Sequence, residues 1–73
     1  MDILYRVQEE RRENEETGSY IAYGIEALRG GALCRRISDI SSEEEEVKGL
    51  VALCNQNRLD IRHLDDVVED WIG

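Results

Sequence analysis

The spacing of apolar residues changes once along this 73-residue chain, and that change constrains the fold class. Up to Ile40 the chain contains runs in which apolar and polar residues alternate, a period of two that is typical of strands with one buried face. After Ser42 apolar residues recur every three or four positions, as in helices that bury one stripe. We therefore expect an α+β protein of order β-β-β-α-α, a three-stranded antiparallel β-meander packed against a C-terminal helical hairpin. The length allows one small domain, residues 1–73.

Three alternating runs mark the expected strands. The first begins at Ile3, and a Gly30–Gly31 turn separates the second from the third, because adjacent glycines readily adopt positive φ. Residues 9–18 are charged, have no apolar anchor, and are expected to form a loop or a frayed hairpin end. Gly24 indicates a β-bulge or a place where a helix backbone comes close. The residues expected to face the helices are Ile3, Tyr5, Val7, Ile21, Tyr23 and Ile25.

Two registers are open for the second and third runs. A two-residue Gly-Gly turn pairs Glu26 with Arg35 but directs Ile37 away from the core face. A three-residue turn pairs Ile25 with Arg35 and keeps Ile37 and Leu33 on the core face. Burial of an isoleucine contributes about 1.5–3 kcal/mol, whereas a surface ion pair contributes at most about 1 kcal/mol. We therefore favour the three-residue turn, or the two-residue turn with a bulge.

Capping residues indicate where the two helices begin. Ser41 or Ser42 precedes a run of glutamates at capping-box spacing, and the positive end of the helix dipole stabilises those glutamates. Asp60 is a good N-cap residue for the second helix. The expected buried stripes are Val47, Leu50, Val51 and Cys54 in the first helix, and Leu64, Val67, Val68, Trp71 and Ile72 in the second.

The charge balance indicates which kinds of partner the protein is not expected to bind. The chain carries 17 acidic and 9 basic residues, a formal net charge of -8. Residues 1–40 hold 8 acidic and 6 basic side chains (net -2), and residues 41–73 hold 9 and 3 (net -6). Without a basic stripe, direct binding to nucleic acid or to an anionic membrane is not expected. No apolar run is long enough to cross a bilayer, and the first residues do not resemble a signal peptide, so we expect a cytoplasmic protein.

Few residues are candidates for catalysis or metal binding. His63, the only histidine, shares a helix face with Asp66 and Asp70, a pattern more typical of local hydrogen bonds than of a metal site. Cys54 lies on the buried stripe, where a thiol is normally inert. Cys34 has basic neighbours that favour a thiolate, but no histidine lies nearby in the sequence. We expect no catalytic residue, no cofactor and no metal.

The acidic residues of the helices form a candidate docking face for a basic partner, although a solvated surface is the simpler interpretation. Its members are Glu43, Glu44, Glu45, Glu46, Asp65, Asp66, Glu69 and Asp70. Such a face offers an alternative function, an acidic nucleic-acid mimic that inhibits a DNA- or RNA-binding protein.

The second face of the expected sheet is less polar than a free face needs to be. Tyrosine and arginine are enriched at the centres of protein interfaces. We therefore predict a homodimer or partner interface here, and a function as a non-catalytic protein–protein interaction module or homo-oligomer. The candidate interface residues are Leu4, Arg6, Tyr20, Ala22 and Leu28.

Three segments carry a resemblance to a known family. They are Tyr23-Gly24-Ile25, Asp39-Ile40-Ser41 and His63–Ile72, and the most distinctive part is Asp66-Val67-Val68-Glu69-Asp70. The chain resembles, over nearly its whole length, a family of short uncharacterised proteins from clostridia and related Firmicutes. The resemblance implies a bacterial cytosolic protein of unknown function, and it implies no catalytic residue.

Overall fold

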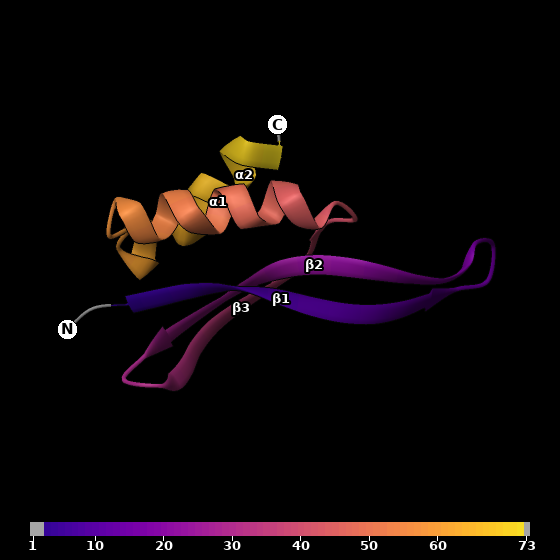
Figure 1. Cartoon of the computed structure of the whole chain (residues 1–73), viewed down its shortest axis with the longest axis horizontal. Coiled ribbons are helices and arrows are strands. Elements are labelled where there is room, and N and C mark those ends of the chain that lie inside the picture. The colour runs from indigo at the N-terminus through magenta and orange to yellow at the C-terminus, as the bar shows by residue number, and fades with distance from the viewer. Residues whose placement is uncertain (1–2, 73) are drawn as a thin grey trace.

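The computed structural model describes residues 3–72 and contains one sheet covered on one side by helices (Figure 1). The elements are β1 (Ile3–Asn14), β2 (Gly18–Arg29), β3 (Ala32–Ser41), α1 (Glu44–Gln56), the 3-10 turn η1 (Ile61–His63) and α2 (Leu64–Ile72). The strands are antiparallel and lie in the order β1-β2-β3. The expected α+β architecture is confirmed.

The core lies between the sheet and α1. Its largest fully buried side chains are Tyr5, Ile25, Leu50, Leu64 and Val47. In Figure 1, α1 runs along the sheet, and the C-terminal end of α2 lies on the side of α1 away from the strands. As a result α2 contributes its first turns to the core, and Ile72, which was expected on the buried stripe, is exposed.

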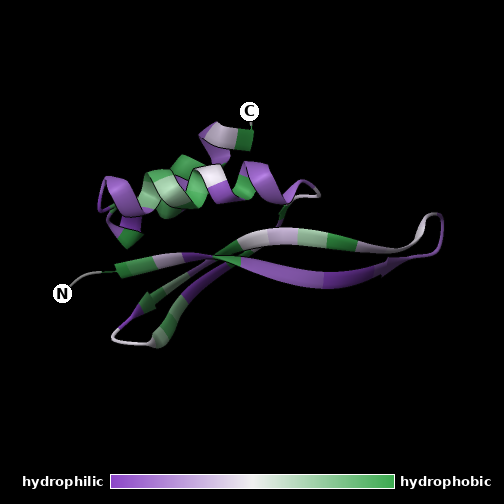
Figure 2. Cartoon of the chain, in the orientation of Figure 1, coloured by the Kyte–Doolittle hydropathy of each residue, from purple (hydrophilic) through white to green (hydrophobic). Residues whose placement is uncertain are grey.

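The β1–β2 hairpin extends beyond the helical layer as a two-stranded arm. Residues 9–18 were expected to form a loop or a frayed hairpin end. They form a hairpin end, but it is fully paired: β1 continues to Asn14 and only residues 15–17 form the turn. Gly18, with φ +79°, starts β2. The pairing of β1 with β2 is continuous to Asn14. Strand hydrogen bonds therefore extend through a segment in which the sequence shows no alternation of apolar residues. Ile21, which was expected under the helices, lies on this arm and is exposed; Figure 2 shows that the arm's β1 strand is mostly hydrophilic.

The turn between β2 and β3 contains two residues, Gly30–Gly31, both with positive φ. Leu28 pairs with Leu33 next to the turn; the register then shifts by one residue, and Ile25 pairs with Ile37. The two-residue turn with a bulge is therefore confirmed, and the three-residue turn is wrong. The bulge keeps Ile37 on the core face, as expected, but it leaves Leu33 on the opposite face, contrary to expectation.

A second irregularity surrounds Gly24. The β2–β3 register shifts between Tyr23 and Ile25, so the pairing is irregular at Gly24 as expected, although the additional residues belong to β3. A Cβ atom added to Gly24 would lie 2.1 Å from the backbone oxygen of Ile37. The close backbone therefore belongs to β3 and not to a helix.

The first helix starts later than the serines predict. Glu43 is its N-cap residue, and no side chain caps it. Ser41 is still part of β3, paired with Tyr23, and its Oγ accepts a hydrogen bond from the Glu43 N–H at 3.0 Å. The expected serine capping box is therefore wrong, because pairing within the sheet holds Ser41 in an extended conformation.

The N-cap expected at Asp60 is confirmed, with one modification. Its carboxylate accepts a hydrogen bond from the Arg62 N–H at 2.9 Å, and the turn that it caps is η1, which leads into α2. Within residues 3–72, no helix combines the length and the apolar character that crossing a membrane requires.

Candidate functional site

The face of the sheet that points away from the helices carries an apolar row across all three strands. Leu4 pairs with Leu28, and Leu28 pairs with Leu33. We call these three residues the leucine row. The central Leu28 is only 8% exposed, whereas Leu4 is 58% and Leu33 50% exposed. Nothing among residues 3–72 covers the two outer leucines, so this end of the sheet presents apolar surface to solvent.

Next to the leucine row, Arg6, Glu26 and Arg36 pair across the same three strands. We call them the arginine row. Arg6 Nε donates to Glu26 Oε1 at 2.8 Å, and Arg36 Nη2 donates to Glu26 Oε2 at 2.6 Å. Glu26 is buried, while both arginine side chains are about half exposed. Each carboxylate oxygen is therefore bound by a different guanidinium, and the arginines are held in place beside the leucines.

The electrostatics of the arginine row follow from these contacts. Hydrogen bonds from Arg36 and then Arg6 hold the pKa of Glu26 below its ordinary value of 4.5, and they outweigh burial, which acts in the opposite direction. Glu26 is therefore ionised at neutral pH. With two guanidiniums around one carboxylate, the row carries a net charge of +1.

The structure divides the predicted interface residues into two groups. Leu4, Arg6 and Leu28 lie in the two rows, whereas Tyr20 and Ala22 lie further along the arm. Leu28 and Ala22 are buried and offer little contact surface. Leu33 is absent from the predicted set because the three-residue turn placed it on the core face, whereas the two-residue Gly-Gly turn pairs it with Leu28 on the open face.

The outer edge of β1 is covered by one side chain of α1. Asn55 Oδ1 accepts the Tyr5 N–H at 2.8 Å, and Asn55 Nδ2 donates to the Tyr5 carbonyl at 2.8 Å. The side-chain amide thus replaces the peptide group of a neighbouring strand. No local pattern in the sequence distinguishes Asn55 as an edge partner. The edge of β1 is therefore protected at Tyr5.

The predicted acidic docking face contains both paired and unpaired carboxylates. Lys48 lies 3.6 Å from Glu44 and 3.7 Å from Glu45, and Arg35 lies 2.5 Å from Asp65. The five members without an ion pair among residues 3–72 are Glu43, Glu46, Asp66, Glu69 and Asp70. Within the predicted docking face, unpaired negative charge is therefore restricted to these five positions.

The two thiols lie in different environments. Cys34 is exposed at the β3 bulge, and Cys54 is buried in the core as expected; both are free. Burial raises the pKa of the Cys54 thiol above its ordinary value. His63 is exposed, and its backbone N–H donates to the Asp60 carbonyl at 2.9 Å. Residues 3–72 contain no cluster of three or more side chains suited to a metal ion.

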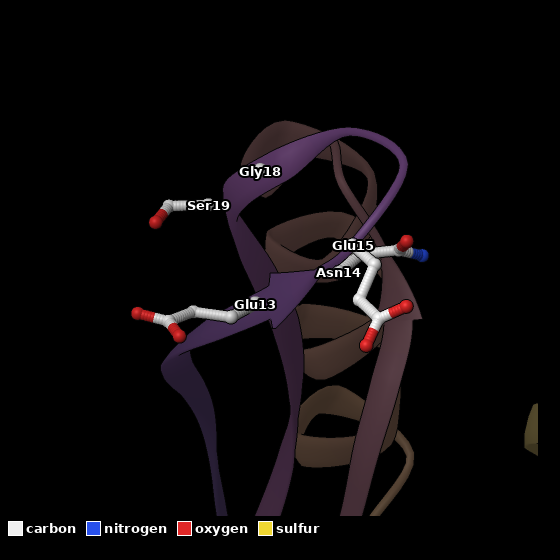
Figure 3. A pocket seen from close by; sticks show the side chains of 5 residues that line it. All are labelled: Glu13, Asn14, Glu15, Gly18 and Ser19. Carbon is white, nitrogen blue, oxygen red and sulfur yellow. The ribbon is translucent and has the colours of Figure 1, made fainter.

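A shallow hollow lies beside the turn of the arm, but its side chains do not converge. In Figure 3, Glu13 and Ser19 point to one side of the ribbon, and Asn14 and Glu15 point to the other. Carboxylates that diverge into solvent cannot hold one ligand together, so this hollow is not a candidate binding site.

These features define a small α+β domain with two layers and one open, partly apolar sheet face. The chain belongs to the family of unknown function DUF6514, whose model matches residues 1–73. The expected membership in a family of uncharacterised proteins is thereby confirmed. No curated protein matches the chain, and no solved structure matches it.

Proposed function

We propose that this protein is a non-catalytic protein–protein interaction module that forms a homodimer through the open face of its sheet. The leucine row is the observation that carries this proposal. Its two outer members, Leu4 and Leu33, are half exposed on a face that no described element covers. The flanking Arg6 and Arg36 are fixed by Glu26, so they lose little conformational entropy when a partner packs on them.

The accessible surface of the chain supports association. It amounts to 5222 Å², whereas a compact protein of this mass exposes roughly 4,600 Å². The excess, on the order of 600 Å², approaches the ~800 Å² that each partner contributes to a standard interface. The elongated chain therefore exposes more surface than a compact monomer of its mass, which favours association.

A second copy of the chain is the occupant that fits the leucine row best. An isologous dimer places the same patch on both subunits, and a row of leucines is complementary to itself. A domain of this size buries so little apolar surface that the monomer is only marginally stable, and association commonly adds stability to such domains. The bacterial cytosolic setting implied by the family resemblance fits an exposed Cys34 that stays reduced.

Light scattering coupled to size-exclusion chromatography tests the homodimer. At tens of micromolar we expect twice the 8.4 kDa mass of the chain. Leu33→Glu places a charge in the leucine row and should give a monomer, because burying an unpaired carboxylate is costly.

The matched control for this test is Leu53→Glu. Leu53 is 52% exposed, similar to Leu33, but it lies on α1 in the helical layer. The Leu53→Glu variant should remain dimeric. A dimer held by the apolar leucine row should also remain associated when salt is added. A monomeric wild-type protein, or a Leu33→Glu variant that is still dimeric, would refute the proposal.

A further inference from the structure

A groove of about 310 Å³ lies between α1 and α2. Leu50 and Cys54, both buried, form its floor, and Leu53, Val67 and Trp71 form its apolar walls. Leu53 is half exposed and Trp71 partly exposed, so the groove is open to solvent. It lies on the helical layer, so it is separate from the leucine row.

Among the residues that line this groove, only Asp70 is charged. Asp66 precedes Asp70 by one turn of α2, and Glu46 precedes Leu50 by one turn of α1, so both lie toward the same side. None of these three carboxylates forms an ion pair within the described part of the chain, whereas Asp65 and Glu44 do. Unpaired negative charge therefore accompanies the apolar groove.

We infer that this groove binds a basic amphipathic helix of a partner protein. Apolar side chains at i, i+3 and i+4 of such a helix enter a groove of this type. Lysine or arginine side chains on its flanks then reach Asp70 and its neighbours, and the face of Trp71 accepts a cation as well. The inference does not depend on the homodimer, because it uses the opposite layer of the molecule.

Trp71 is the only tryptophan in the chain, so its fluorescence reports on this groove directly. The probe is a synthetic helical peptide of leucine and lysine with leucines at i, i+3, i+4 and i+7. We expect saturable binding with a shift of the Trp71 emission maximum. A leucine and glutamate peptide with the same leucine positions should bind at least about tenfold more weakly, because its charges repel Asp70.

Two substitutions test whether the groove itself is the site. Leu53→Glu should weaken binding of the leucine and lysine peptide at least about tenfold, since it removes an apolar wall. Asp70→Asn should weaken binding about two- to fivefold at low salt. The matched control is Asp65→Asn, which changes the net charge equally but removes a carboxylate that is already paired with Arg35, and it should leave binding nearly unchanged.

A peptide of lysine and alanine, with the same charge but no leucines, completes the test. If it binds as tightly as the leucine and lysine peptide, long-range charge alone drives the contact. The groove inference then fails, and the acidic nucleic-acid mimic gains support. The inference also fails if Asp70→Asn and Asp65→Asn weaken binding equally. Leu33→Glu, which tests the homodimer, should not alter the peptide titration.

Discussion

Two glycines in this chain occupy opposite environments. At Gly24 a Cβ atom would lie 2.1 Å from the Ile37 carbonyl oxygen and 3.0 Å from the Ser38 Cα, both parts of the β3 backbone. At Gly49, inside α1, a Cβ atom would meet nothing within 4 Å. Only the first glycine is required by its neighbours, and nothing in the structure explains the second.

We predict that Gly24→Ala lowers the free energy of unfolding by about 1–3 kcal/mol, because the methyl group forces β2 and β3 apart at the bulge. Gly49→Ala should instead raise the free energy of unfolding by about 1 kcal/mol, because alanine favours a helix interior more than glycine does. Urea denaturation of both variants provides the measurement. Equal effects of the two substitutions would contradict the close approach of β3 at Gly24.

At the scale of the element, the sheet is held together by rows of side chains that cross all three strands. In the arginine row a buried carboxylate joins β2 to both neighbours through Arg6 and Arg36. Such a row ties the edge strands to the central strand on a face that lacks helices. Its contribution depends on the ionisation of Glu26.

The stability of the sheet should therefore depend on pH. The folded-state pKa of Glu26 lies below its ordinary value of 4.5. Its contribution to stability is therefore present above about pH 4.5 and is lost as the pH falls through the folded-state pKa. We expect Glu26→Gln to have a lower urea midpoint than wild type at pH 7 and a smaller loss on acidification.

Glu45→Gln is the control for this prediction, since Glu45 has the same chemistry on an exposed position of α1. It should follow the wild-type pH profile. Arg62 holds the pKa of Asp60 below its ordinary value as well. Because Asp60 is present in every variant, the difference between the pH profiles of wild type and Glu26→Gln reports on Glu26 alone. Parallel profiles for wild type and Glu26→Gln would show that the arginine row does not stabilise the fold.

At the scale of the whole molecule, Tyr5 joins the two layers at three points. Its N–H and carbonyl bind the Asn55 side chain, and its hydroxyl donates to the Leu59 carbonyl at 2.6 Å. The backbone of β1 is thereby attached to the end of α1, and the ring is attached to the loop before η1. These contacts explain how a chain this short fixes a helical layer on its sheet.

We predict that Asn55→Ala lowers the free energy of unfolding by about 1–3 kcal/mol, because it leaves the Tyr5 N–H and carbonyl without partners. The amide of Tyr5 should also exchange faster with solvent deuterium. Asn57→Ala is the control, because the Asn57 Nδ2 donates only to the Leu53 carbonyl of its own helix and should change stability by no more than about 0.5 kcal/mol. Similar losses in both variants would contradict the bridging role of Asn55.

The order of the elements, the fold class and the buried stripe of α1 could all be predicted because they depend on local periodicity. A period of two or of 3.6 is a property of a continuous segment and needs no distant partner. The same holds for the N-cap at Asp60 and for an irregularity in the strand pairing at Gly24. The arm could not be predicted in this way, because residues 9–14 are all polar and carry no alternation of apolar side chains.

The remaining features were decided by contacts between segments that are distant in the sequence. Leu33 and Ile37 lie on opposite faces because one extra residue in β3 between them shifts the pairing with β2, and a shift of one residue moves a side chain to the opposite face. Asn55 binds the Tyr5 backbone at the edge of β1 only when α1 packs beside that strand. By itself the sequence thus determined which segments are strands and helices, through local spacing. The tertiary structure alone decided which side chains remain uncovered, because strand register and the docking of layers are set by non-local pairing.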